Sequence, residues 1–465
     1  MTTTRRPLAA LLAVAALALA ACGGDDSDDG GAAAADDAAA EGTDGATLAV
    51  PGDHDTIQDA VDAAEPGDLI LVEPGTYEEA VNIETDELTI RGTDRNEVIL
   101  DGGFELDNGI RVVGASGVAV ENMTARNYTN NGFFWTGVEG YRGSYLTTYR
   151  TGDYGIYAFD SVKGLIEHSY TSGSPDAGVY IGQCYPCDAV IDDVVSEYNG
   201  LGYSGTNSGG NLLIVNSTFR FNRAGIVPNS GSYELCYPER RTTIVGNLVY
   251  SNNQPDTPAI DVALDAMGNG ILAAGGVGNT IERNRVWDHD LTGIGLVPFP
   301  EEDANDVVPP ASDDDQPCSE AKGEPTAGPA DIPGTVLWEP RDNEVVGNAV
   351  DQSRLADIAV GTLGDASRLG NCFSDNEHAS SAPTAVEALA PCEGEGNDGD
   401  WTAGALDFAP FLAEKPPSGD YKTAPVPEDQ ENMPDADDAP ARPATDVPAD
   451  IDVDAIEVPD KTEGA

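Results

Sequence analysis

The chain has 465 residues, and its 82 acidic and 23 basic side chains give a formal net charge of −59 at pH 7. A surface with this charge repels nucleic acid and anionic lipid, so neither is expected as a partner. It suits surroundings rich in salt or divalent cations. The four histidines and four methionines are not clustered, which argues against a copper site.

Residues 1–21 have the layout of an export signal, because Arg5 and Arg6 precede an apolar run that ends in small residues before Cys22. This pattern resembles a bacterial lipoprotein signal, and the resemblance implies cleavage before Cys22 and a lipid attached to its sulfur. An ordinary secretory signal is the alternative. We expect a protein on the extracytoplasmic face of the cell membrane, held there by the lipid anchor only. Residues 22–46, rich in Asp, Ala and Gly, are predicted to form a disordered acidic tether.

Two patterns define the folded region. Ile57, Ala60 and Val61 share one face of a short predicted helix, which begins with the capping-box pattern Asp55-Thr-Ile-Gln58. Farther on, a glycine followed by an apolar residue recurs about every 23 residues, at Gly109, Gly132, Gly155, Gly178, Gly202, Gly225, Gly270 and Gly293. A period of this size predicts a solenoid whose coils bury their apolar faces against one another, with the helix capping its open end.

The segments EPGTYEEAVNI (73–83), LTIRGTD (88–94) and VILDGG (98–103) carry a family resemblance. They resemble the opening of right-handed parallel β-helix proteins of the pectate-lyase-like group. The resemblance implies an all-β fold, a right-handed single-stranded parallel β-helix, over residues 47–392. The carboxylate motifs of pectin methylesterases and polygalacturonases and the Arg-Asp-x-x-Arg pattern of the lyases are absent. The resemblance therefore indicates a fold and no particular reaction.

Alternation along each coil sends the residue after the glycine inward and the next residue outward. The outward positions of successive coils then include an aromatic strip, formed by Phe134, Tyr157, Phe159 and Tyr180. Such a strip either stacks on sugar rings or forms a plain ladder within the sheet.

The glycine period is interrupted by insertions near residues 233–240, 254–268 and 298–334. The first and third are expected to wall one edge of the first sheet and the second the other edge, which predicts a ligand cleft. We expect this cleft to be the ligand site in preference to the aromatic strip. Its floor is expected to comprise Tyr180, Gln183, Ser204, Thr206, Asn207 and Asn229, and Tyr157 of the strip is a further candidate for substrate binding.

Charged residues of the insertions supply candidates for chemistry on a glycan, which needs paired carboxylates or a base assisted by a cation. Arg240, Asp261 and Asp265 are the catalytic candidates, and the alternative is that they are solvated loop charges. Asp153 and Asp176 lie two positions before their glycines on successive coils, where they either support turns or bind calcium.

Six cysteines follow Cys22, and an even number in an exported protein favours disulfides. The preferred pairing joins Cys236 to Cys318, because both fall in wall loops of nearby coils, and leaves Cys184–Cys187 and Cys372–Cys392. Pairing of Cys184 or Cys187 with Cys236 remains an alternative.

Residues 393–465 are rich in Pro, Ala, Asp and Glu and are predicted to be largely disordered, apart from an apolar patch around Trp401, Phe408 and Phe411 that docks on the last coil. The complete pattern favours a monomeric, lipid-anchored β-helix protein that binds a polysaccharide or cell-surface glycan. A carbohydrate-active enzyme (lyase, hydrolase or epimerase) and a structural or adhesive surface protein are the alternatives.

Overall fold

A computed structural model of the chain describes residues 45–301, 318, 326–327, 335–397, 399–436, 439–445 and 451–461. The expected signal, Cys22 and nearly all of the tether lie outside these residues, as does most of the 298–334 insertion. Among the described helices, none has the length and apolar character needed to cross a membrane.

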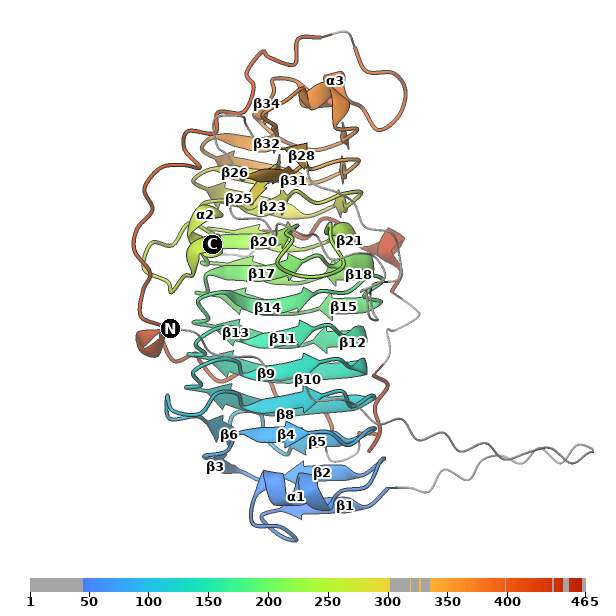
Figure 1. Cartoon of the computed structure of the whole chain (residues 1–465), viewed down its shortest axis with the longest axis vertical. Coiled ribbons are helices and arrows are strands. Elements are labelled where there is room, and N and C mark those ends of the chain that lie inside the picture. Colours follow the sequence, from blue (N-terminus) through green and yellow to red (C-terminus); the bar gives the residue numbers. More distant parts are fainter. Residues whose placement is uncertain are drawn as a thin grey trace, which may run out of the picture. The chain divides into compact units, whose positions relative to one another are not determined.

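The described chain forms a right-handed parallel β-helix capped by a short helix, as expected from the sequence (Figure 1). Helix α1 (Ile57–Ala63) buries Ile57, Ala60 and Val61 near strands β1 (Thr47–Val50) and β2 (Leu69–Val72). Its N-cap is Thr56, whose hydroxyl accepts a hydrogen bond from the Asp59 amide. The cap is thus one residue later than the capping-box pattern predicts.

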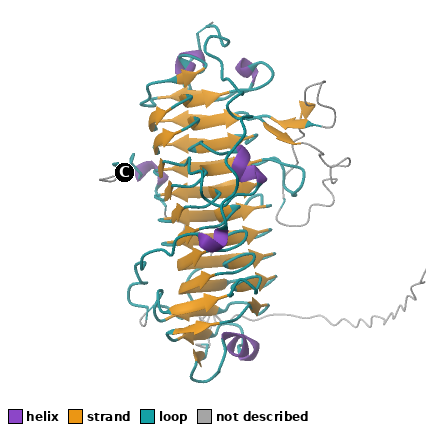
Figure 2. Ribbon diagram, turned by 90° about the vertical axis from the view of Figure 1, so that its left-hand side faces the viewer, coloured by secondary structure: helices purple, strands orange, loops and turns teal. Residues whose placement is uncertain are grey.

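Sheet 1 contains one strand from each coil, stacked in parallel (Figure 2). Its strands are β4 (Val81–Ile83), β7 (Ile110–Val113), β9 (Phe133–Thr136), β11 (Ile156–Phe159), β14 (Ala177–Gly182), β17 (Leu201–Thr206), β20 (Ala224–Asn229), β23 (Ile271–Ala274), β26 (Thr292–Val297), β32 (Ala356–Val360) and β34 (Ser381–Ala382). The residues after the repeated glycines pair from coil to coil and are buried, as the alternation predicts: Ile110, Phe133, Ile156, Val179, Tyr203, Ile226, Ile271 and Ile294.

Within the described residues, sheet 2 has twenty strands, which close the rest of each coil. It contains β1 and β2 with β3 (Gly75–Tyr77), β5 (Thr89–Gly92), β6 (Val98–Asp101), β8 (Val118–Arg126), β10 (Glu139–Tyr149), β12 (Val162–Glu167), β13 (Tyr170–Ser172), β15 (Ala189–Asp192), β16 (Val195–Glu197), β18 (Gly209–Val215), β19 (Thr218–Arg220), β21 (Arg240–Val245), β22 (Leu248–Tyr250), β24 (Thr280–Glu282), β25 (Arg285–His289), β30 (Glu344–Val346), β31 (Ala349–Ser353) and β33 (Cys372–Ser374). A separate antiparallel sheet comprises β27 (Phe299–Glu301), β28 (Thr326–Ala327) and β29 (Val336–Trp338). The other α-helices in the described part of the chain are α2 (Asp261–Asp265) and α3 (Val386–Leu389).

The glycine period has a steric cause. A Cβ atom at Gly109 would lie 2.5 Å from the carbonyl oxygen of Gly132, and one at Gly132 would lie 2.7 Å from the oxygen of Gly155. Each glycine therefore lets its coil approach the main chain of the next. The repeat that identifies the fold marks the closest approach between coils.

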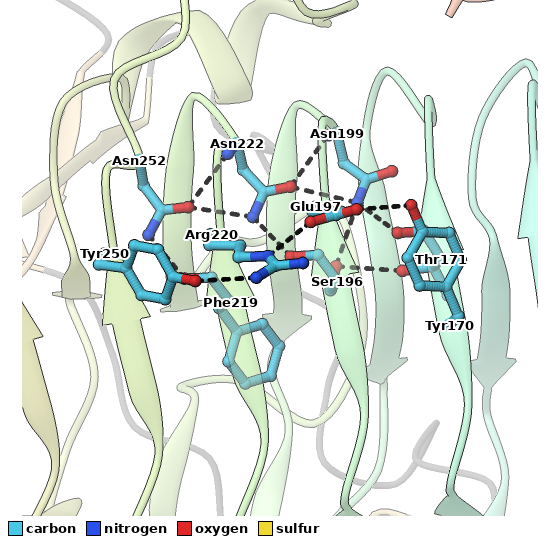
Figure 3. A network of polar contacts seen from close by, with 10 residues as sticks. All are labelled: Tyr170, Thr171, Ser196, Glu197, Asn199, Phe219, Arg220, Asn222, Tyr250 and Asn252. Atoms are coloured by element: carbon cyan, nitrogen blue, oxygen red, sulfur yellow. Dashed lines mark hydrogen bonds and ion pairs between the residues drawn. The ribbon is translucent and has the colours of Figure 1, made fainter. Parts of the chain in front are cut away.

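Buried asparagines run along one turn of the solenoid (Figure 3). The Asn222 amide group donates to Asn252 Oδ1 at 3.0 Å and to the Ser196 carbonyl at 2.9 Å, while its Oδ1 accepts from the Asn199 main-chain N–H at 2.9 Å. All three asparagines are fully buried. The ladder satisfies main-chain groups that the turn would otherwise bury without partners.

A second polar column lies beside this ladder, on the third strand of each coil (Figure 3). Arg220 donates to Glu197 at 2.5 Å and to the Tyr250 hydroxyl at 2.9 Å, and the Tyr170 hydroxyl donates to Glu197 at 2.7 Å. These contacts join four successive coils.

The described residues of the C-terminal region, which composition predicts to be largely disordered, lie along the solenoid. Leu406 and Phe408 approach Gly361 of the last coils, as the docking of the apolar patch requires. Beyond them, residues 414–461, which we call the strap, return along the solenoid (the orange to red trace in Figure 1). The strap contacts coils near Arg223, Arg150 and Arg91 in turn and then those near Arg283. Composition alone did not reveal this path, because the strap has little apolar sequence of its own.

Candidate functional site

The 230–239 segment, between β20 and β21, folds over the outward face of sheet 1. Asn207 Nδ2 donates to the carbonyls of Gly231 at 2.6 Å and Glu234 at 2.8 Å. The Leu235 amide donates to Gln183 Oε1 at 2.9 Å. These bonds draw the segment, which we call the cover loop, onto the sheet.

The cover loop changes the expected cleft. The predicted floor residues Tyr180, Ser204, Thr206, Asn207 and Asn229 are buried, and Gln183 is half-buried. Their polar groups are largely used by the loop and by one another, for example Asn229 Nδ2, which donates to the Tyr233 hydroxyl at 2.7 Å. The 233–240 insertion, which was expected to form one wall of the cleft, therefore covers the predicted floor. It does so because the side-chain amides of the floor make the hydrogen bonds that the main chain of the insertion needs.

Covalent and polar contacts hold the cover loop in place. Cys236 forms a disulfide with Cys318. The Glu301 carboxylate accepts hydrogen bonds from the Ser232 amide at 3.0 Å and from Trp338 Nε1 at 2.8 Å. The other disulfides are Cys184–Cys187 and Cys372–Cys392, so all three pairs are those that the sequence favours.

The three catalytic candidates are not brought together. Arg240 lies on β21 of sheet 2, donates to the Cys236 and Pro238 carbonyls, and has its guanidinium 3.6 Å from the centre of the Tyr185 ring. Asp261 and Asp265 are exposed on α2. This geometry favours the alternative, that these charges are structural or solvated.

The aromatic strip, in contrast, remains partly accessible on sheet 1. Phe134 and Tyr157 stack with ring centres 4.7 Å apart, and Phe159 lies 5.9 Å from Tyr157. These three rings are half-buried. Tyr180 meets Tyr157 edge-on at 4.9 Å but is buried below the cover loop. Three of the four rings thus present a surface to solvent.

Tyr154 is a member of this cluster that the sequence patterns did not reveal. Its ring stacks on Tyr157 at 4.3 Å and lies 5.0 Å from Tyr180. It precedes Gly155 directly, at the position where the two preceding coils carry Asn108 and Asn131. The signal in the sequence was an aromatic residue at a position where the two preceding coils carry asparagine.

Three carboxyl groups border the rings. The Tyr154 hydroxyl donates to Asp176 Oδ2 at 2.5 Å, and the Tyr180 hydroxyl donates to both Glu234 oxygens at 2.7 Å. Among the described residues, the Asp153 carboxylate makes no side-chain hydrogen bond, and it is half-buried. We call these three residues the carboxyl group cluster.

Burial disfavours the charged forms of the cluster. It raises the pKa of Asp153 to about 6. Burial is also the main cause that raises the pKa of Asp176 to about 7 and that of Glu234 to about 8, against the opposing effect of the tyrosine hydrogen bonds. The raised pKa values of Asp176 and Glu234 favour their protonated forms near neutral pH, in which each can donate as well as accept a hydrogen bond.

The calcium hypothesis gains no support from this arrangement. In the described part of the chain, no group of three or more Asp, Glu, His or Cys residues is placed to hold a metal ion. Asp176 is instead used by Tyr154.

Comparisons with known proteins place the chain by its fold. The family model described as "Right handed beta helix region" matches residues 108–298. No curated protein matches the sequence. The solved structures that it resembles include the A-module of Azotobacter vinelandii mannuronan C-5 epimerase AlgE4, at 14% identity over 73% of this chain and 92% of that chain, with a TM-score of 0.42.

Two further structures give similar values. The alginate lyase from Paenibacillus sp. str. FPU-7 is 14% identical over 73% of this chain and 96% of that chain, with a TM-score of 0.41. Pectate lyase Pel9A is 14% identical over 84% of this chain and 90% of that chain, with a TM-score of 0.40. The family match over residues 108–298 agrees with the stacked parallel strands of the structure, which form a right-handed parallel β-helix.

Proposed function

We propose that this protein binds a polysaccharide along sheet 1, on the half-buried rings of the aromatic strip, and that its N-terminal sequence anchors it by lipid on the extracytoplasmic face of the cell membrane. One observation carries the binding proposal. Phe134, Tyr157 and Phe159 lie side by side on a rigid sheet, whose coils are about 4.8 Å apart. The apolar faces of sugar rings pack on such surfaces, and a flat row accepts several sugars of a chain.

The carboxyl group cluster supplies polar recognition at one side of the strip. Asp153 and the Tyr157 hydroxyl make no side-chain hydrogen bond among the described residues, so each can bond to a sugar hydroxyl. Buried ionisable groups with displaced pKa values are concentrated at functional sites. The site is thus apolar with a few convergent polar groups, which is typical of ligand sites.

The test is a glycan-binding screen with a soluble form that starts at residue 45, followed by calorimetry on each glycan bound. We expect Tyr157→Ala and Phe134→Ala each to weaken binding at least tenfold. The matched control is Tyr145→Ala, because Tyr145 is also half-buried and stacked, on His168 at 4.7 Å, but lies on sheet 2. Equal effects of all three changes, or no binding to any glycan, would contradict the proposal.

Turnover is the second candidate function, and the displaced pKa values of the cluster favour it. Groups that titrate between pH 6 and 8 can act as general acids or bases near neutrality. The same glycans are incubated with the protein and analysed for new reducing ends, which indicate hydrolysis, and for unsaturated products, which indicate elimination. Loss of product with Asp153→Asn and retention of binding would assign the chemistry to the cluster.

A further inference from the structure

The strap is held mainly through its main chain. Arginines of the coils donate hydrogen bonds to its carbonyl oxygens: Arg91 to Ala436, Ala439 and Pro440, Arg95 to Glu431, Arg142 to Ala444, Arg150 to Ala424, Arg223 to Pro416 and Pro417, Arg283 to Val453 and Ile456, and Arg285 to Pro459. A carbonyl oxygen accepts such a bond whatever side chain its residue carries. The contacts therefore do not depend on the acidic side chains of the strap.

Several of these arginines already have carboxylate partners in the coils. Arg91 pairs with Glu121 at 2.8 Å, and Arg142 pairs with Glu121 at 3.2 Å and with Glu167. Arg283 pairs with Glu282 at 2.8 Å. Their positive charge is thus neutralised locally and does little to offset the charge of the strap.

The end of the strap adds an apolar contact. Ile451, Val453 and Ile456 pack on an outward-facing apolar patch of sheet 2, which comprises Leu165, Val190, Val215 and Val245. The patch residues are at most 3% exposed in the described structure. Without the strap they would form a contiguous apolar surface, which soluble proteins rarely expose.

Long-range charge opposes this docking. The strap carries 14 acidic and four basic side chains, and residues 45–412 carry 59 acidic and 17 basic ones. The strap and residues 45–412 both carry net negative charge, so they repel each other through solvent. The screening length of this repulsion is about 30 Å at 0.01 M salt and about 3 Å at 1 M. Lys461 at the end of the strap forms an exposed ion pair with Asp351 at 2.9 Å, which salt weakens, but such a pair contributes about 1 kcal/mol or less. The hydrogen bonds to carbonyls and the apolar contacts of residues 451–461 are far less sensitive to salt than the repulsion.

We propose that ionic strength controls the docking of the strap: high salt closes residues 451–461 over the apolar patch, and low salt releases them. The sign is the reverse of that expected for a segment held by ion pairs, which salt would loosen. The protein would thereby expose its apolar patch only in dilute surroundings.

The test is amide hydrogen exchange of the full chain at pH 7 in about 0.02, 0.15 and 1.5 M NaCl. We expect protection of residues 451–461 to rise at least tenfold across this series, with β14 of sheet 1, which is not part of the apolar patch, as an internal reference of unchanged protection. A parallel series in sucrose separates charge screening from general stabilisation of burial, and we expect no comparable rise there. Protection that falls with salt, stays constant or is absent at every salt concentration would overturn the proposal.

Variants test charge repulsion and the apolar contact with the patch separately. Asp454, Glu457 and Asp460 are exposed, so the triple variant Asp454→Asn, Glu457→Gln, Asp460→Asn removes charge without removing a docking contact, and we expect it to be protected already in low salt. Ile456→Asp should abolish protection at every salt concentration. The matched control is Val426→Asp, because Val426 belongs to the strap but is 60% exposed. A triple variant that keeps the full salt dependence would contradict the role of repulsion.

Discussion

The Tyr180 hydroxyl donates a hydrogen bond to both carboxylate oxygens of Glu234, each at 2.7 Å, and so ties sheet 1 to the cover loop. Tyr180 also contacts Tyr157 of the aromatic strip edge-on. A change in the protonation or position of Glu234 therefore acts, through Tyr180, on Tyr157 of the proposed glycan surface. The cover loop is part of the site even though it covers the cleft that it was expected to border.

Tyr180→Phe removes this hydrogen bond and leaves the ring in place. Because the bond from Tyr180 lowers the pKa of Glu234, we expect that pKa to rise further in the variant. We also expect hydrogen exchange in residues 230–239 to increase about tenfold, as the loss of a bond of about 1.4 kcal/mol implies. Tyr203→Phe is the control, since Tyr203 is a buried tyrosine of sheet 1 whose hydroxyl donates to the Ile181 carbonyl at 3.3 Å. A similar loosening of the loop in both variants would contradict the assignment.

The stability of the fold should decrease as pH rises through neutrality. Burial is the first cause that raises the pKa values of Asp153 to about 6, Asp176 and Glu239 to about 7 and Glu234 to about 8. In the unfolded chain such groups titrate near pH 4. Between these values the folded state binds more protons, so its stabilisation is complete at low pH and is lost as pH rises through the folded pKa values.

The measurement is the thermal midpoint at constant ionic strength from pH 6.5 to 9. His289, whose pKa burial lowers to about 3, has the opposite effect, but its effect fades above about pH 7.5, where the unfolded imidazole is also neutral. We expect the midpoint to fall over the measured range and Glu234→Gln and Glu239→Gln each to flatten the slope. Glu428→Gln, at an exposed strap position, should leave the slope unchanged. A midpoint that rises with pH would show that the buried carboxyl groups do not dominate.

The asparagine ladder makes a separate prediction about stability. Asn222→Ala removes four hydrogen bonds to buried groups on the adjacent coils, and water does not reach these groups to replace the lost bonds. We expect a loss of about 2–4 kcal/mol in unfolding free energy, measured by chemical denaturation. Asn253→Ala is the control, because Asn253 is half-buried and its side chain makes two bonds: it donates to the Asp288 carbonyl at 3.3 Å and accepts from Gln254 Nε2 at 3.0 Å. Comparable losses in the two variants would refute a special role for the ladder.

The periodic part of the molecule could be predicted from the sequence because periodicity and geometry coincide there. Gly109 and Gly132 recur at the interval that brings two main chains together, and Ile110 and Phe133 follow at the positions that alternation turns inward. The disulfide of Cys236 and Cys318 followed from the same register, since it located both cysteines in wall loops of nearby coils.

The site and the strap escaped prediction because their contacts obey no period. Nothing in the order of residues indicates that Glu234 lies over Tyr180 and not beside it, since a ten-residue loop can be folded either way. The path of the strap along the solenoid could not be predicted for another reason. Its composition indicates disorder, but its acceptors are main-chain carbonyls, and their donors, such as Arg91 and Arg95, are far away in the sequence.

Arg223 provides the sharpest test of how the strap and the insertions depend on each other. It is fully buried and donates to the Pro255 carbonyl at 2.7 Å, to Thr257 at 2.8 Å and to Pro417 at 2.7 Å, so one guanidinium joins the 254–268 insertion to the strap. A lysine ammonium carries the same charge but cannot reach these divergent acceptors with a planar fork. We expect Arg223→Lys to lower the unfolding free energy by about 2–4 kcal/mol and to increase hydrogen exchange in both segments together.

The matched control for Arg223→Lys is Arg354→Lys, because the Arg354 side chain is 76% exposed and pairs with Asp290 at 2.9 Å. An exposed pair of this kind contributes about 1 kcal/mol or less, so the control should be nearly neutral. If exchange rises in only one of the two segments, they dock independently, and the strap is held at that point by contacts other than the shared guanidinium. If hydrogen exchange rises in both segments, Arg223 couples the 254–268 insertion to the strap.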